Sequence, residues 1–235
     1  MTQEMERTDA PARPRDTEDG RKSETRAPWM IPMALMVVAF LIYQLPPYAA
    51  LDPTKSRIPL QTPSHYWLIV GHVLTGAVWL IAGLLQVWPW LRIRKPAVHR
   101  WTGRAYVFLG AIPSATFAIL MLPVAFPAGK VGVAMSASLS AGAAILGWVK
   151  LRQRKYAAHR QLMLVSFAIM WGQIIWGFMI GVPFAFGWVG GPETDFNVVV
   201  EAARWVGWVA NLVLLLWWFN RTSGRRINGL RGVRA

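Results

Sequence analysis

Long uninterrupted apolar runs, separated by short polar segments, are the main feature of the chain. A run of about 20 apolar residues can cross the ~30 Å hydrocarbon core of a bilayer as an α-helix. Backbone groups in lipid must be satisfied within the segment, which favours helices, and the period-2 alternation of a membrane β-barrel is absent. We therefore predict an all-α, polytopic membrane bundle of six transmembrane helices, at Trp29–Tyr48, Tyr66–Trp90, Trp101–Phe126, Val131–Val149, Leu162–Phe186 and Val198–Phe219.

The distribution of charge predicts the orientation of this bundle. Of the 235 residues, 54% are hydrophobic and 15% are charged, and the net charge is +14. Basic residues gather after the second, fourth and sixth runs, whereas the opposite loops hold only Lys55, Arg57 and Lys130. With six spans, all three basic clusters fall on one side, which the positive-inside rule assigns to the cytoplasm. We therefore predict a cytoplasmic (inner) membrane protein with both termini cytoplasmic.

Because the positive charge is explained by orientation, it does not indicate binding to nucleic acid. The basic clusters are expected to contact anionic lipid headgroups, at about 1 kcal/mol per residue near the surface. No cysteine is present, which excludes disulfides, thiolate ligands and covalent haem attachment. The signatures of hydrolytic and nucleotide-driven enzymes are also absent, namely a Gly-rich phosphate loop, a nucleophile elbow and a His-Glu-x-x-His motif. The sequence leaves open whether the protein is an enzyme.

The chain divides into three parts. Residues 1–28 are rich in Pro, Arg, Asp, Glu and Thr, so we predict a disordered cytoplasmic tail. Residues 29–220 form the transmembrane domain, and residues 221–235 form a basic cytoplasmic tail. The first span is either a retained anchor or a cleaved signal peptide. The long preceding tail, together with Gln44, Pro46 and Pro47 at the end of the span, favours the anchor.

A decapeptide occurs twice, sixty residues apart. The segment Leu91–Arg100 returns as Leu151–Arg160 with seven of ten positions identical. Each copy lies between two apolar runs, so the repeat relates spans two and three to spans four and five. This predicts a parallel internal duplication about an axis along the membrane normal. The fourth span is rich in Gly, Ala and Ser, which allow close helix packing, and is predicted to be central.

The repeat places His99 and His159 at equivalent positions near the cytoplasmic interface. Two imidazoles that face each other across a pseudo-twofold axis can ligate a b-type haem or a metal ion, because neutral histidine is a common nitrogen ligand for both. Two alternatives are that they line a site for another ligand, or that both are interfacial polar residues. They would then cap helices or contact lipid phosphates beside Arg100 and Arg160.

A second group of ionisable residues lies nearer the other face. His72 is about 10 Å inside the second span, at a depth where an ionisable side chain indicates function. Glu201 and Arg204 are three residues apart in the sixth span, which is the spacing of an intrahelical ion pair. Alternatively, these two residues join His72 and Gln173 in a polar pocket that binds a quinone headgroup or another small ligand. The spacing identifies no second axial ligand for a haem at this face.

The residues also carry a family resemblance. His72 and Gln86 are followed by His99-Arg100-Trp101-Thr102-Gly103-Arg104-Ala105-Tyr106 and by Ala158-His159-Arg160. This pattern resembles the DUF2306 family, in which a His-Arg-x-x-Gly-Arg-x-Tyr stretch and a second His-Arg pair are characteristic. The resemblance covers roughly residues 66–186. The second motif departs from the family, because Met163-Leu164-Val165-Ser166 stands where Met and then Arg usually occur. The resemblance implies a multi-pass membrane protein whose activity is not established.

Two functional classes remain open. The first is a membrane redox protein that uses haem b or a quinone, with His99 and His159 as inner ligands of the haem or of a metal and His72 in the outer pocket. The second is a non-catalytic, transporter-like or accessory protein whose basic cytoplasmic loops bind lipid or a partner. The sequence does not predict an oligomeric state. Four residues of the two motifs are expected to act as interface anchors: Arg100, Arg104, Tyr106 and Arg160.

Overall fold

All regular elements in the part of the chain that the structure describes are helical. The computed structural model describes residues 27–185, 187, 188, 190, 191 and 193–231, with side chains for all of these except 176–178, 181, 182, 185 and 223–231. The elements are α2 (Met30–Gln44), α3 (Pro46–Ala49), the 3₁₀-helix η1 (Pro53–Lys55), α4 (Pro63–Val87), α5 (Pro89–Arg94), α6 (Pro96–Arg104), the π-helix η2 (Ala105–Ala111), α7 (Ile112–Leu120), α8 (Lys130–Arg152), α9 (Tyr156–Ala185) and α10 (Phe196–Arg231). The all-α fold class is confirmed. The predicted disorder of residues 1–26 and the end of the basic tail, residues 232–235, lie outside the described residues.

Four described helical segments are long and apolar enough to cross a membrane. They are Pro63–Val87, Pro96–Leu120, Lys130–Arg152 and Phe196–Thr222, and they correspond to the second, third, fourth and sixth predicted spans. The first predicted span is divided into α2, a 15-residue apolar helix, and the short α3. The fifth lies within α9 up to Ala185, and its last residue, Phe186, is outside the described residues. A multi-pass membrane protein is thus supported, and the count of six spans remains a prediction.

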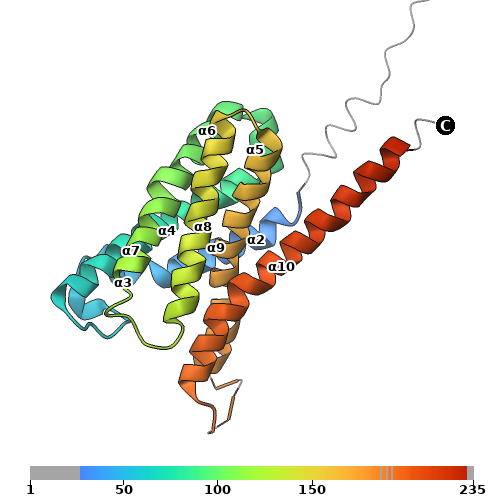
Figure 1. Cartoon of the computed structure of the whole chain (residues 1–235). Helices are drawn as coiled ribbons and strands as arrows, with labels where there is room; N and C mark the ends of the chain where they lie inside the picture. Colours follow the sequence, from blue (N-terminus) through green and yellow to red (C-terminus); the bar gives the residue numbers. More distant parts are fainter. Residues whose placement is uncertain (1–26, 186, 189, 192, 232–235) are drawn as a thin grey trace, which may run out of the picture.

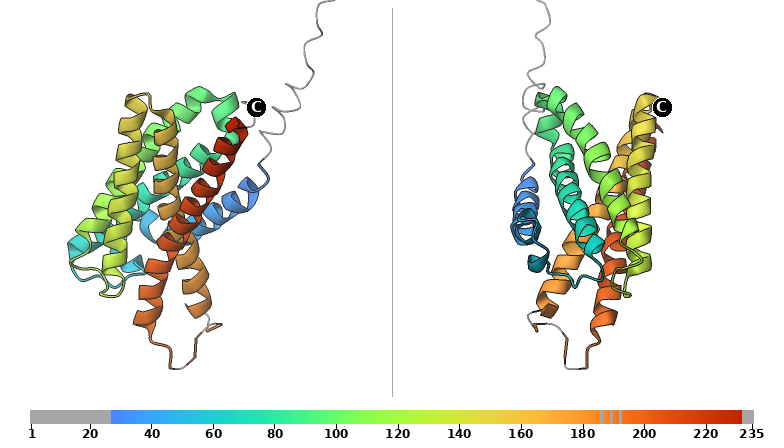
Figure 2. Two further views of the ribbon diagram at one scale, coloured as in Figure 1. Left: turned by 45° about the vertical axis from the view of Figure 1, so that its right-hand side comes forward. Right: turned by 90° about the vertical axis from the view of Figure 1, so that its left-hand side faces the viewer.

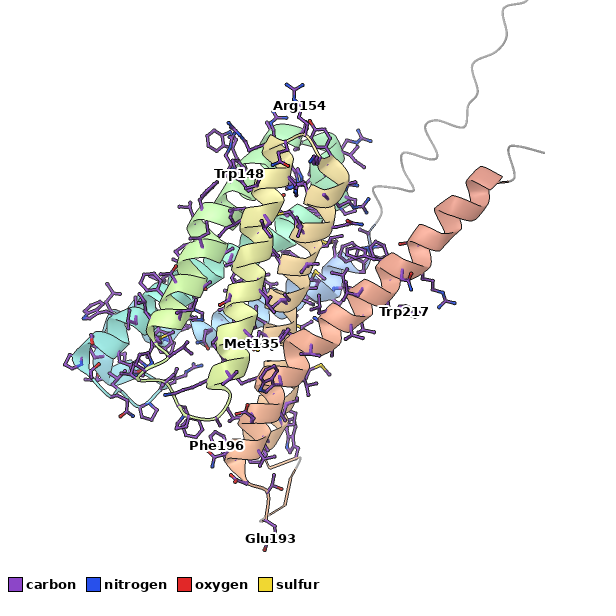
Figure 3. All side chains as sticks on the ribbon, viewed as in Figure 1. Met135, Trp148, Arg154, Glu193, Phe196 and Trp217 are labelled. Carbon is purple, nitrogen blue, oxygen red and sulfur yellow. The ribbon has the colours of Figure 1, made fainter. Side chains whose placement is uncertain are left out.

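Successive long helices run in alternating directions through the bundle (Figure 1). The connection from α4 to α6, the turn between α8 and α9 and the end of α10 therefore lie toward the same end. Figure 3 shows Trp148 and Arg154 at this end, and Glu193 and Phe196 at the opposite end. The three basic clusters thus share one end of the bundle, as the sequence predicted. The side of the membrane that this end faces remains a prediction.

Helix α2 and the upper part of α10 frame the bundle. The right-hand view of Figure 2 shows α2 at one edge, beside α4, with α8 toward the opposite edge. Helix α10 crosses α9 in its first half and then diverges from the other helices (Figure 1). Leu215 and Trp218 of α10, together with Trp29 directly before α2, line a cavity that is described below.

A tight crossing between α4 and η2 lies at the centre of the fold. Gly110 of η2 faces the backbone of Trp79, so closely that an added Cβ would lie 2.6 Å from the Trp79 Cα atom. Glycine is required here because two helix backbones meet with no side chain between them. Beside the crossing, the Tyr106 hydroxyl is 2.9 Å from the Ser166 Oγ atom, and Tyr106 is only 1% exposed.

Helix α8 packs against both α7 and α9 through its small residues, and it lies toward one edge of the bundle (Figure 2), so its central position is not confirmed. Its buried positions include Ser136, Ala137, Ser140, Ala141, Ala144 and Gly147.

The two copies of the decapeptide share local structure only around their histidines. Lys95 and Lys155 each precede a new helix, and the backbone N–H groups of His99 and His159 donate to their carbonyls at 3.0 Å and 2.9 Å. Upstream the copies differ, because Pro89 starts the separate helix α5 whereas α8 continues without a break through the equivalent position. The internal duplication remains a prediction.

Candidate functional site

Two cavities lie in opposite halves of the bundle, and together they take in the predicted site residues apart from Glu201, Arg100 and Arg104. The first, which we call the His99–His159 cavity, has a volume of about 560 Å³. Its wall is formed by the end of α4, α5, α6, η2, the start of α9 and the diverging part of α10. Its polar lining includes Gln86, Arg92, His99, Tyr106, Tyr156, His159 and Arg160.

The His159 ring is held by the main chain of α8. Its Nδ1 atom lies 2.9 Å from the Gly147 carbonyl oxygen. Because a carbonyl oxygen can only accept, Nδ1 carries the hydrogen and Nε2 keeps its lone pair. An added Cβ at Gly147 would meet the Met163 sulfur at 2.8 Å, so the absence of a side chain lets α9 approach this carbonyl.

The His99 ring is not bonded in this way. Its Nδ1 atom is buried and has no hydrogen-bond partner among the described residues. The backbone of His99 is fixed instead, because Gln86 Nε2 donates to the His99 carbonyl oxygen at 2.7 Å and to Thr102 Oγ1 at 2.6 Å. The end of α4 therefore positions the first turn of α6, while the His99 ring itself forms no hydrogen bond with the described residues.

The four expected anchor residues differ in their surroundings. Arg100 and Arg104 are exposed, and the Arg104 guanidinium lies 4.6 Å from the centre of the Trp101 ring. Arg160 is also exposed and lines the His99–His159 cavity. Tyr106 is buried against Trp79 and bonded to Ser166, so it differs from the three exposed arginines, and its role as an anchor stays a prediction. The π-helix that begins at Ala105 turns the Tyr106 side chain into the core.

The second cavity, which we call the His72 cavity, has a volume of about 210 Å³. It is mostly apolar and is bounded by α2, α4, α7, α8, α9 and α10. The predicted residues His72, Gln173 and Arg204 all line it, together with Gln44 and Ser114. The His72 Nδ1 atom lies 2.9 Å from the Ser114 carbonyl oxygen, and therefore donates to it. Its Nε2 atom has no partner among the described residues.

Glu201 and Arg204 do not form the ion pair that the sequence left open. The Glu201 carboxylate accepts from the Gly129 N–H group at the start of α8 and, at 2.7 Å, from Trp205 Nε1. A carboxylate at a helix N-terminus is favourable, so Glu201 serves to join α10 to α8. In the described part of the chain the Arg204 guanidinium has neither an ion-pair nor a hydrogen-bond partner. Arg204 is exposed at the protein surface and lies at the edge of the His72 cavity.

One pair of aromatic rings connects the walls of the two cavities. Trp79 lines the His72 cavity, and Tyr106 lines the His99–His159 cavity. Their ring centroids are 6.1 Å apart, in an edge-to-face arrangement. This contact could not be predicted from the sequence, because the two residues lie on different helices and only Tyr106 belongs to one of the two motifs.

Several other features of the site were also missed from the sequence. Gly147 and Ser114 contribute main-chain oxygens, which no side-chain pattern reveals. Arg92 belongs to the repeat but was interpreted as an orientation signal only. The described residues contain no group of three or more His, Cys, Asp or Glu that could hold a metal ion.

The fold and the two cavities define a multi-pass helical membrane protein with polar groups inside its bundle. The family model of DUF2306, described as a predicted membrane protein, matches residues 69–219, which is well over half of the chain. The chain belongs to the DUF2306 family, as the His-Arg-x-x-Gly-Arg-x-Tyr stretch predicted. No curated protein and no solved structure matches it.

Proposed function

We propose that the protein is a membrane electron carrier that binds one haem b in the His99–His159 cavity. The observation that carries the proposal is that both histidines line a single cavity of about 560 Å³. This volume lies within the range of roughly 300–1,000 Å³ that is usual for sites of small molecules and cofactors. The two histidines come from α6 and α9, so the ligand would join the two hairpins of the predicted repeat.

The ring nitrogens support axial ligation. Histidines that bind a metal usually donate their other ring N–H to a carbonyl or carboxylate, as His159 does to Gly147. The His99 ring has no competing partner within the described residues and can turn a nitrogen toward an iron atom. A buried polar atom without a partner is costly, at about 1–3 kcal/mol, so a ligand that uses this ring would be favoured.

The remaining lining suits a flat, apolar group with acidic substituents. Trp88, Phe167 and Trp218 provide aromatic surface, and Arg92 and Arg160 can pair with the two propionates of haem b. A porphyrin also supplies four nitrogen ligands of its own, so two histidines complete the coordination of its iron. The same two histidines would leave a bare metal ion with an incomplete shell.

A haem held by His99 and His159 would supply one-electron redox chemistry, because both histidines would be used as ligands and neither would be left for a substrate. The function that follows is one-electron transfer near the basic end of the bundle. The exposed basic residues at this end would contact anionic headgroups or an acidic redox partner.

The test is the absorption spectrum of protein purified in detergent from haem-replete cells. We expect a Soret band, an α-band after reduction with dithionite, and one haem per chain by extraction. His99→Ala and His159→Ala should each lose most of the haem, and added imidazole should restore binding to His159→Gly. His65→Ala is the matched control, because His65 is buried at the start of α4 and lines neither cavity.

Two results would overturn the proposal. Wild-type protein without a Soret band would exclude the haem and favour the alternative class, an accessory or transporter-like protein. Full haem content in both histidine variants would show that other residues ligate the iron.

A further inference from the structure

The His72 cavity contains an acceptor and a donor that the protein does not use. The Nδ1 hydrogen of His72 is given to the Ser114 carbonyl, so the Nε2 lone pair is free to accept. The Arg204 guanidinium can only donate, and it has no partner among the described side and main chains. Glu201, the nearest acid on α10, is bonded to Gly129 and Trp205 instead.

The surrounding wall restricts the class of ligand. Most of it is apolar, with Phe40 and Leu41 of α2 and the following Leu45 on one side and Val133 and Ile174 on others. A ligand must therefore be largely apolar and must offer both an O–H donor for His72 and an oxygen acceptor for Arg204. A carboxylate would satisfy Arg204 but would leave the His72 Nε2 atom without a donor.

We propose that this cavity binds the headgroup of a membrane quinol. One ring hydroxyl would donate to His72 Nε2, and another ring oxygen would accept from Arg204. The apolar side chains of α2 would cover the start of the polyprenyl tail, which can continue into lipid. Gln173 holds the local geometry, since its Nε2 atom donates to the Arg204 carbonyl oxygen at 3.1 Å.

Quinol binding is independent of the proposed function. The use of the quinol as an electron donor rests on that function, because it requires the haem. Oxidation of one quinol to quinone releases two electrons and two protons. One electron would go to the ferric haem of each of two protein molecules, which gives two ferrous haems. The first proton would pass to His72 Nε2 and the second to water. Trp79 lines the His72 cavity and Tyr106 lines the His99–His159 cavity, and the edge-to-face contact of their rings would connect donor and acceptor through these two side chains.

Binding is tested first, by titrating detergent-purified full-length protein with decylubiquinol and with decylubiquinone and following tryptophan fluorescence. Trp79 lines the cavity, so saturable quenching is expected for the wild type. His72→Ala and Arg204→Gln should each weaken quinol binding about tenfold or more, as expected for the loss of one charge-assisted or buried hydrogen bond. His65→Ala and Arg57→Gln are the matched controls, because neither residue lines the cavity, and both should bind as the wild type does.

Electron transfer is tested second, by stopped-flow reduction of the ferric haem by decylubiquinol. His72→Ala and Arg204→Gln should reduce at least tenfold more slowly, with an unchanged haem spectrum. If the wild type contains no haem but binds quinol through these two residues, the proposed function fails and the binding site stands. If both variants bind as the wild type does, or if oleate displaces the quinol at equal concentration, the quinol site is refuted whatever the haem content.

Discussion

The close crossing of α4 and η2 gives a sharp prediction for Gly110→Ala. The added methyl carbon would lie 2.6 Å from the Trp79 Cα atom and 2.9 Å from its backbone nitrogen, whereas ordinary contact begins at 3.4 Å. The two helices must therefore separate by about 0.8 Å, because backbone atoms cannot rotate away as side chains do. Overpacking of one methyl group costs about 1–3 kcal/mol, and the change from glycine to alanine returns at most about 1 kcal/mol. We expect a net loss of about 1–2 kcal/mol.

The assay is thermal unfolding in detergent, followed by tryptophan fluorescence and by the loss of monodisperse protein. A loss of this size corresponds to a fall in Tm of roughly 2–8 °C for a domain of this length. The matched control is Gly142→Ala in α8, where an added Cβ meets nothing within 4 Å. The control should be neutral or slightly stabilising, because alanine is the better helix former. If Gly110→Ala has the Tm of the wild type, or if Gly142→Ala lowers the Tm by the same amount, the crossing does not have the assigned geometry.

Three further predictions concern hydrogen bonds and helix contacts. Ser166→Ala removes the partner of the buried Tyr106 hydroxyl and should cost about 1–3 kcal/mol in thermal unfolding, whereas adding Tyr106→Phe should recover much of the loss. Gly172→Ala would press a methyl group against the Gly207 carbonyl oxygen of α10 and push α9 and α10 apart. It should therefore lower the Tm and also weaken quinol binding, and a change in only one of these two quantities would contradict the prediction. Hydrogen bonds from the Thr54 hydroxyl and N–H lower the pKa of the exposed Asp52 carboxyl. The ionised Asp52 carboxylate therefore stabilises the folded protein at pH values above its pKa in the unfolded chain, about 3.9, and this stabilisation is lost as the pH falls through the pKa of the folded state. Thr54→Val removes the hydroxyl bond and should raise the Asp52 pKa, which a carboxyl NMR titration can measure.

Hydrophobic length and charge placement were enough to predict the helical segments. Apolar runs of about 20 residues have one physical solution in a bilayer, so the segments around Trp79, Ser114 and Ala141 are helices as expected. The alternating directions follow from the short polar connections. They bring the turn at Arg154 to the same end as α5. The same reasoning places His99 and His159 at one end, because the repeat gives them equal distances from their basic clusters.

Side-chain directions could not be predicted in the same way. Tyr106 follows Arg100, Trp101 and Arg104 in the sequence, all of which are exposed. The π-helix after Arg104 adds a residue to the turn and directs the Tyr106 ring into the core. Glu201 and Arg204 have the spacing of an ion pair, but a loop glycine competes for the carboxylate. That competitor, Gly129, is seventy-two residues away and becomes adjacent only after α8 and α10 have packed.

The break in α4 explains why a sequence repeat produces an asymmetric pair of histidines. The residue equivalent to Gly147 in the first copy is Val87, which ends α4 because Trp88 is extended before Pro89. The His159 ring can therefore bond to the main chain of the unbroken α8, whereas His99 is held only through its own backbone by Gln86. One imidazole is preorganised with a known tautomer and the other is free to adjust. If an iron atom joins them, His159 sets the position of the site and His99 moves to complete it, so loss of the Gly147 contact should impair both ligands.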